Sequence, residues 1–271
     1  MKLFRIIRRL ILIIIIFSII VFGGYAYFIS PNDYSFKKYE FTHKNISSQL
    51  NGFKIAFISD LNLNNKENLT KLNKAIDELN SYPFDMIIFG GDLYDGPVFN
   101  TKEISATLKK ISCKYGKFAI LGDKDQNMSL EVSEVLNNGG FEVITNEART
   151  IYYKDTSFTM IGCQENKDIS KFKTNKKDMI LCITHQPDSF SQYQGSVDLQ
   201  LSGHSYGGSI YIPFYGAITS MEGAMIYNHG TYEKSGSTLI VSNGFSGPIS
   251  FPYKLFARNE IQFITLKTSS S

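Results

Sequence analysis

The longest apolar run of the chain lies near its beginning. Residues 10–29 (LILIIIIFSIIVFGGYAYFI) are almost entirely apolar, and about 20 such residues are enough for a helix to cross the ~30 Å hydrocarbon core of a bilayer. We therefore predict a transmembrane helix. A cleaved signal peptide is the alternative, because Gly24 and Ala26 flank Tyr25 in a pattern that resembles a cleavage site. The uncleaved anchor is favoured, since the run exceeds the usual ~7–15 residues of a signal-peptide core.

Four basic residues precede this run: Lys2, Arg5, Arg8 and Arg9. Because the positive-inside tendency keeps such residues in the cytoplasm, we expect residues 1–9 to be cytoplasmic and residues 10–29 to cross the cell membrane once. The rest of the chain would then be extracytoplasmic. Residues 30–50, which begin with the polar stretch SPNDYSFKKY, are expected to form a tether and the start of a domain that extends over residues 51–268.

Beyond the expected tether, short apolar runs alternate with a helical pattern. Residues 53–59 (FKIAFIS) and 85–90 (DMIIFG) each predict a buried strand. Between them, apolar residues recur at the spacing of one helix face: Leu69, Leu72, Ile76 and Leu79. A strand, helix and strand of about 30 residues form a crossover unit, so the two strands should lie parallel in one sheet.

The alternation continues toward the C-terminus. A helix is expected near residues 101–111 and a strand at 117–121. From residue 141 onward the pattern is rich in strands, with runs at 141–144, 149–153, 157–161, 179–184, 199–202 and 238–241. A chain of 271 residues that also carries an anchor suits one α/β domain with a single core.

The turns that follow these strands carry acids and histidines. They are Ser59-Asp60-Leu61-Asn62, Gly90-Gly91-Asp92-Leu93, Gly122-Asp123-Lys124-Asp125, Thr184-His185-Gln186-Pro187 and Ser202-Gly203-His204-Ser205-Tyr206-Gly207-Gly208. In parallel sheets, the turns after the carboxyl ends of the strands gather at one edge, where ligands bind. Carboxylates combined with imidazoles suit Mn, Fe or Zn. The sequence therefore predicts a metal site at this edge.

Each of these residues has an ordinary explanation when taken alone, because an Asp after a strand often caps a helix and a single His is usually a hydrogen-bonded polar residue. As an ordered set they resemble the calcineurin-like metallophosphoesterases, whose pattern is D-x-H, G-D, G-N-H-[DE], a single His and G-H-x-H. The resemblance extends from about residue 54 to 266, and the segments SGHSYGGSIYIPF and YEKSGSTLIVSNGFSG are similar to those of membrane-anchored bacterial members. It implies a four-layer α-β-β-α sandwich built around two mixed sheets.

The resemblance also implies two metal ions bridged by the G-D aspartate, and this chain departs from that arrangement. The ligands of the first site would be Asp60, Asn62, Asp92 and Tyr206, so both histidines of that site are missing. The ligands of the second site would be Asp92, Asp123, His185 and His204, and all of these can bind a metal. We expect one divalent ion (Mn, Fe or Zn), with two or none as the alternatives.

Lys124 stands where the family has a histidine that assists the leaving group, and Asp125 follows it. An ammonium with a reference pKa of ~10.4 is a poor proton donor at neutral pH, but it keeps its positive charge. We assign Lys124 and Asp125 as candidate catalytic residues. We expect Lys124 to lie near Asp60, where its charge would partly replace that of the missing ion.

Two functions follow from these expectations. The first is a metal-dependent phosphoesterase that faces the outside of the membrane, hydrolyses phosphate mono- or diesters and has reduced activity. The second is a catalytically inactive relative that binds a phosphate ligand or acts as an interaction module at the cell surface. A net charge of +3 with scattered lysines does not indicate a nucleic-acid surface. His43 and His229 match no ligand position, and Phe245, Phe251 and Tyr253 are expected in core packing, with an apolar entrance as the alternative.

Overall fold

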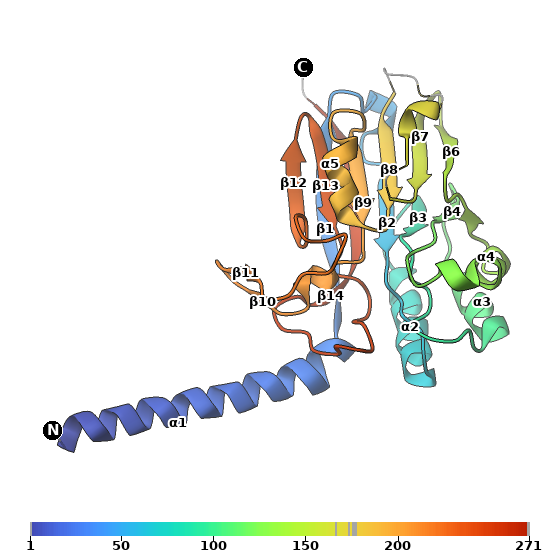
Figure 1. Ribbon diagram of the computed structural model, residues 1–271. Coiled ribbons are helices and arrows are strands. Elements are labelled where there is room, and N and C mark those ends of the chain that lie inside the picture. Colours follow the sequence, from blue (N-terminus) through green and yellow to red (C-terminus); the bar gives the residue numbers. More distant parts are fainter. Residues whose placement is uncertain (1, 166, 173, 175–177, 270–271) are drawn as a thin grey trace.

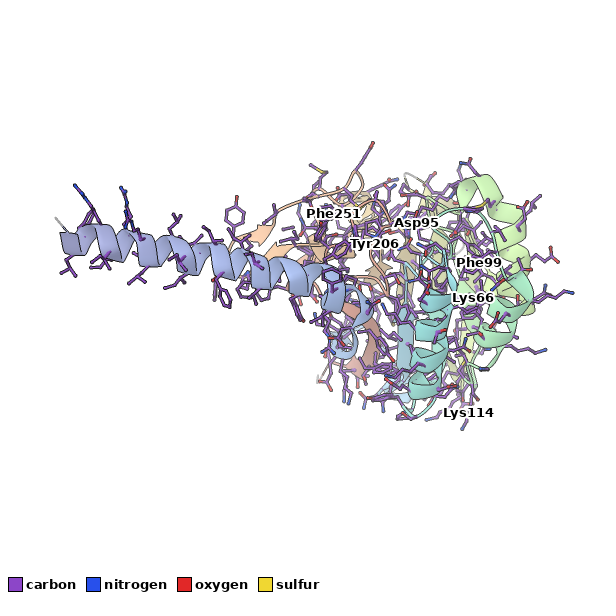
Figure 2. All side chains as sticks on the ribbon, turned by 90° about the horizontal axis from the view of Figure 1, so that it is seen from below. Lys66, Asp95, Phe99, Lys114, Tyr206 and Phe251 are labelled. Carbon is purple, nitrogen blue, oxygen red and sulfur yellow. The ribbon has the colours of Figure 1, made fainter. Side chains whose placement is uncertain are left out.

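A long helix stands apart from a two-sheet domain in the computed structural model, which describes residues 2–165, 167–172, 174 and 178–269 (Figure 1). Helix α1 (Lys2–Gly24) continues through a π-helical turn (Tyr25–Ile29) and a 3-10 turn (Ser30–Asn32). Its apolar side chains are exposed, and its length and composition are sufficient for a membrane span. The view from below shows the same helix pointing away from the domain (Figure 2).

The domain contains two six-stranded sheets. The first has the order β1-β14-β2-β3-β4-β5. Its strands are β1 (Tyr34–His43), β14 (Asn259–Thr268), β2 (Lys54–Ile58), β3 (Met86–Phe89), β4 (Lys117–Ala119) and β5 (Glu142–Val143). All neighbouring pairs are parallel except β14 and β2. The predicted crossover unit is confirmed, because β2 and β3 pair in parallel with Ile55 opposite Met86.

The second sheet has the order β12-β13-β9-β8-β7-β6. Its strands are β12 (Gly230–Lys234), β13 (Ser237–Val241), β9 (Leu199–Ser202), β8 (Ile180–Thr184), β7 (Thr156–Cys163) and β6 (Glu147–Tyr153). The four inner strands are parallel, and the two outer strands pair antiparallel to their neighbours. A small hairpin outside both sheets consists of β10 (Tyr211–Ile212) and β11 (Gly216–Ala217).

Apolar side chains fill the space between the sheets, as Phe57 and Ile88 of one sheet pack with Leu181 and Leu201 of the other. The outer face of the first sheet is covered by α2 (Lys66–Leu79), α3 (Thr101–Lys109) and α4 (Ser129–Asn138). On the second sheet, Tyr193 of the short helix α5 (Phe190–Tyr193) packs against Ile161 and Cys182. The result is the expected α-β-β-α sandwich.

The structure places a strand where a tether was expected. Residues 30–33 lead into β1, which begins at Tyr34, lies at the edge of the first sheet and pairs with β14 along its whole length. Tyr34 and Phe36 pack against the helical layer, whereas Tyr39 and Phe41 face the space between the sheets. The apolar positions therefore change from one face of the strand to the other, which interrupts the alternation by which a strand is recognised.

Candidate metal centre

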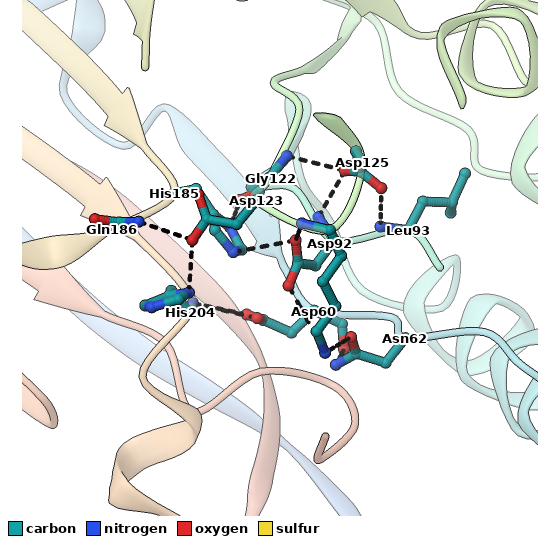
Figure 3. Close-up of polar contacts among 12 residues, drawn as sticks. Asp60, Asn62, Asp92, Leu93, Gly122, Asp123, Asp125, His185, Gln186 and His204 are labelled. Carbon is teal, nitrogen blue, oxygen red and sulfur yellow. Dashed lines mark hydrogen bonds and ion pairs between the residues drawn. The ribbon is translucent and has the colours of Figure 1, made fainter. Parts of the chain in front are cut away.

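The turns after β2, β3 and β4 meet at one edge of the first sheet, as predicted (Figure 3). The backbone N–H of Asp60 donates to the carbonyl of Gly91 at 2.9 Å, and that of Asn62 donates to the carbonyl of Asp92 at 3.1 Å. Five residues around this point have a left-handed backbone: Asp60, Asn62, Asp92, His204 and Tyr206. Such conformations are uncommon for side chains other than glycine and cluster at functional sites.

Asp125 ties two of these turns together. Its buried carboxylate accepts backbone N–H groups from Gly122 and Asp92 at 2.9 Å and from Leu93 at 3.0 Å. Burial and the negative charge of Asp92 raise the pKa of Asp125 to about 6. Both carboxylate oxygens point to backbone rather than toward the other acids (Figure 3).

Two histidines from the second sheet complete the cluster. His185 follows β8 and its Nδ1 lies 2.8 Å from the carbonyl of Gly90, while His204 follows β9 and its Nε2 lies 2.6 Å from the carbonyl of Glu222. Because a carbonyl can only accept, each of these nitrogens carries the proton. Nε2 of His185 and Nδ1 of His204 are thereby left facing the carboxylates, an arrangement that is usual for metal-binding histidines.

The facing atoms form two overlapping groups that could hold metal. One is Asp123, His185 and His204, and the other is Asp60, Asp92 and His185. Within each group the ligand atoms lie within 4.8 Å of one another. Nε2 of His185 is buried and lacks a hydrogen-bond partner, although it lies 3.3 Å from Oδ1 of Asp92. An unsatisfied buried nitrogen beside carboxylate oxygens fits a divalent ion.

The electrostatics of the cluster favour positive charge. Burial raises the pKa of Asp60. Burial also pushes the pKa of Asp92 upward, but the positive charges of His185 and Lys124 outweigh it and lower that pKa to about 2. Burial by itself would lower the pKa of His185, but the charges of Asp92, Asp60 and Asp123 raise it well above its ordinary value. These acids are therefore stabilised by a bound cation or a protonated imidazole.

Lys124 reaches into the same cluster from the turn after β4. Its Nζ lies 2.8 Å from Oδ1 of Asn62, 2.9 Å from the hydroxyl of Tyr206 and 2.8 Å from Oδ2 of Asp95. The side chain is only 25% exposed, so it does not point to solvent. The ammonium therefore joins Asn62 and Tyr206, the two residues expected in place of the first-site histidines.

The partner expected for Lys124 differs from those that the structure gives. Its ion pairs are with Asp95 at 2.8 Å and Asp92 at 3.9 Å. The carboxylate of Asp60 instead accepts the backbone N–H of His204, at 3.1 and 3.2 Å for its two oxygens. Asp95 lies three positions after Asp92 and matches no motif position, so the sequence reasoning missed it.

Tyr206 takes part as a neutral group. Burial, followed by the negative charges of Asp60 and Asp92, raises the pKa of Tyr206 well above its ordinary value. Its hydroxyl oxygen accepts from Lys124 and, at 3.2 Å, from Nδ2 of Asn62. Lys124 thus supplies the positive charge on this side of the cluster.

Two further contacts were not foreseen from the sequence. Nε2 of Gln186 donates to Oδ2 of Asp123 at 2.8 Å, and the same oxygen lies 3.2 Å from Nδ1 of His204. Gln186 follows His185 in the same turn, and this position next to a candidate ligand could have indicated that it lies near the site. The carbonyl of Glu222 could not be found in this way, because every residue carries a backbone carbonyl.

This chain is similar to several known proteins. The family model described as calcineurin-like phosphoesterase matches residues 53–207. The uncharacterized metallophosphoesterase YkuE of Bacillus subtilis is 30% identical over 259 residues, which cover 91% of this chain and 90% of that protein. A transmembrane protein with metallophosphoesterase domain from Danio rerio is 22% identical over 247 residues, 82% of this chain and 55% of its own length. The solved phosphopantetheinyl hydrolase of Mycobacterium tuberculosis has a TM-score of 0.44 and 10% identity, over 71% of this chain and 89% of that one.

Proposed function

Because this chain belongs to the calcineurin-like phosphoesterase family, we propose that it hydrolyses phosphate esters with one divalent ion. Four residues would hold the ion: Asp92, Asp123, His185 and His204. The observation that carries this proposal is the orientation of the two histidines, each of which donates one ring N–H to a backbone carbonyl and turns its other nitrogen toward a carboxylate. When bound, such an ion polarises a phosphate oxygen and lowers the pKa of a coordinated water.

Lys124 would supply a fixed positive charge next to the bound phosphate. An ammonium has three N–H donors, and here all three have acceptors, on Asn62, Tyr206 and Asp95. Lys124 is therefore suited to stabilise negative charge in the transition state rather than to donate a proton to the leaving group. This supports the expectation of reduced activity.

Asp125 would act as a positioning residue. Its carboxylate holds the backbone of Gly122, Asp92 and Leu93, which carry or adjoin ligands of the ion, and its two oxygens are used in those contacts. A catalytic residue must reach the substrate. Of the two candidate catalytic residues, we therefore propose a catalytic role for Lys124 only.

The inactive phosphate binder is the second candidate. It is favoured by the same feature, since an ammonium with no free N–H occupies the side of the cluster where the family binds its first ion. Such a pocket could retain phosphate affinity without turnover.

We also propose a location for the protein at the cell membrane. Helix α1 would anchor the protein in the cell membrane, with residues 1–9 in the cytoplasm and the domain of residues 51–268 outside. The exposed apolar surface of α1 and the basic residues at its start support this orientation.

Metal content and turnover of the full chain in detergent micelles test these alternatives. We expect one equivalent of Mn or Zn, and hydrolysis of an aryl phosphate or a diaryl phosphodiester. His204→Ala should lose both. His43→Ala is the matched control, because His43 lies with Asp198, away from the cluster. Absence of turnover, with or without bound metal, would contradict the phosphoesterase and support the binder.

A further inference from the structure

Exposed apolar side chains of the domain are concentrated in one part of the chain. Among the described residues after the anchor, most of the large exposed hydrophobic residues fall between positions 212 and 256: Ile212, Phe214, Tyr215, Ile218, Met225, Ile226, Ile249, Tyr253 and Phe256. Leu130 and Tyr152 are the exceptions. Single exposed apolar residues need no explanation, but a concentration of them marks an interaction surface.

This part of the chain also lacks charge. Glu222 is the only Asp, Glu, Lys or Arg between positions 205 and 232, and none occurs between 244 and 253. Elsewhere the chain is rich in lysine and acidic residues. An uncharged, aromatic surface has the composition found at the interface between a bilayer and water.

The β10–β11 hairpin forms the outermost part of this surface. Phe214 at its tip is fully exposed and Tyr215 is 80% exposed. Both views show β10 and β11 reaching out of the domain on the same side as α1, alongside that helix (Figures 1 and 2). If α1 crosses a bilayer, the hairpin tip therefore points toward that bilayer.

A second apolar segment, residues 249–256, packs on the domain end of α1. The backbone N–H of Lys254 donates to the carbonyl of Ala26 at 2.9 Å. The Tyr253 ring lies 5.2 Å from that of Tyr27, and the Phe256 ring lies 6.2 Å from that of Phe22. These contacts fix the domain to the helix, so the hairpin keeps its direction relative to the membrane.

We propose that the hairpin and residues 249–256 lie in the headgroup region of the bilayer that α1 crosses. The substrates would then be phosphate esters of amphiphiles that reside in the same leaflet, and this second part rests on the proposed phosphoesterase function. Phenylalanine and tyrosine rings are favourable at this depth, where apolar and polar surroundings meet.

Both membrane-facing segments are connected to the residues around the metal centre. The chain leads from Tyr206 into the hairpin, and the segment that follows β11 contains Glu222, whose carbonyl binds His204. The backbone N–H of Ile249 donates to Oδ2 of Asp95 at 2.9 Å, and the same oxygen binds Lys124. Figure 2 shows Tyr206 between Phe251, on the side of α1, and Asp95. A phosphate at headgroup depth would therefore lie close to these residues.

The absence of tryptophan from the chain allows a direct test of the bilayer contact. The full chain carrying Phe214→Trp is reconstituted in phospholipid vesicles whose acyl chains bear bromine, which quenches indole fluorescence at close range. We expect at least about a twofold loss of emission compared with unbrominated vesicles. Leu130→Trp, at an exposed apolar position on α4, should lose almost none. Equal quenching of the two variants, or none in Phe214→Trp, would overturn the proposed contact.

The substrate class is tested with the double variant Phe214→Glu, Tyr215→Glu in lipid nanodiscs. Turnover of a diacylglycerol phosphate in the disc should fall about tenfold, because two carboxylates bind the headgroup region less favourably than the two aromatic rings that they replace. Turnover of a soluble aryl phosphate should change less than about twofold. Equal losses on both substrates, or cleavage of the aryl phosphate alone by the parent chain, would overturn the substrate class. Failure of the parent on both would instead overturn the phosphoesterase function, and the quenching result would still decide the contact.

Discussion

The ammonium of Lys124 lies 2.9 Å from the hydroxyl oxygen of Tyr206. By the resemblance, Asn62 and Tyr206 are expected in place of the two histidines of the family's first metal site, and Lys124 in place of its catalytic histidine. Nζ of Lys124 also lies 3.9 Å from Oδ2 of Asp92, the carboxylate expected to bridge two ions. A covalently attached cation thus lies on the side of the cluster where the resemblance implies an exchangeable one.

The first prediction is that a second ion can be restored. In the triple variant Asn62→His, Lys124→His, Tyr206→His, the fixed charge is gone and three imidazoles face Asp60 and Asp92. Histidine tolerates the left-handed backbone of Asn62 and Tyr206 better than most residues. Bound metal, measured by elemental analysis and titration calorimetry, should rise from one equivalent to two. An unchanged stoichiometry would show that Lys124 is not what excludes the second ion.

The second prediction separates charge from metal binding. Lys124→Met removes the ammonium but keeps most of the side-chain length. Turnover should fall at least about tenfold, because a fixed charge beside the phosphate is lost. Metal affinity should stay the same or increase, since a positive charge near Asp92 has been removed. Lys124→Arg should recover part of the turnover. A loss of metal in Lys124→Met would mean that the lysine maintains the metal site and does not act on the transition state.

The third prediction concerns Gly91, which has φ +96 in the turn after β3. A Cβ at this position would lie 2.6 Å from the backbone nitrogen of Gly122 and 2.8 Å from Nδ1 of His185. Gly91→Ala should therefore displace His185, lower the free energy of unfolding by about 2–4 kcal/mol and reduce bound metal.

Gly52→Ala provides the matched control for this prediction. Gly52 has φ +89, but a Cβ there would meet nothing within 4 Å. It should show only the backbone cost of about 1–2 kcal/mol, with full metal content. Equal metal losses in the two variants would contradict the steric explanation.

The fourth prediction is a pH dependence of stability at the join between anchor and domain. Nζ of Lys71 on α2 donates to the carbonyls of Pro31 at 2.9 Å and Phe245 at 2.8 Å. Burial lowers the pKa of Lys71 to about 7 from its ordinary 10.5. Between these two values the unfolded chain binds more protons than the folded one, so stability rises with pH by up to about 1.4 kcal/mol per unit for this group.

Thermal unfolding in micelles measures this effect. The midpoint of the parent should rise more between about pH 7 and about pH 9 than that of Lys71→Met, in which the titrating group is absent. Lys254, whose pKa burial also lowers to about 7, leaves some slope in the variant. Identical slopes would show that Lys71 titrates normally in the folded protein.

The central strands and the acids at their ends could be predicted from local patterns. The apolar runs around Ile55 and Ile87 are short, β-branched and followed by polar turns, so both the strands and the gathering of Asp60 and Asp92 followed from the geometry of a parallel sheet. The buried face of α2 likewise followed from the spacing of its leucines.

What escaped prediction depends on contacts between distant parts of the chain. The sequence does not show that Lys124 binds Asp95, because the direction of a long side chain depends on several turns at once. Nor does it show that His204 binds the carbonyl of Glu222, since that contact requires the segment after β11 to return to the site. The edge strand β1 was not predicted, because its pairing partner β14 is the last strand of the described chain and local sequence patterns do not show such a distant contact.

The pairing of β1 with β14 has a consequence for how the protein is made. Strand β14 lies between β1 and the rest of the first sheet. Ser35 of β1 and Asn259 of β14, which are joined by a hydrogen bond, are 224 positions apart in the chain. The strand next to the anchor is therefore unpaired until the ribosome has synthesised β14. Contacts between such distant positions form slowly, and an unpaired edge strand is prone to aggregate in the meantime. A chain truncated before β14 would lack the strand that joins β1 to β2, so β1 could not take its place in the first sheet.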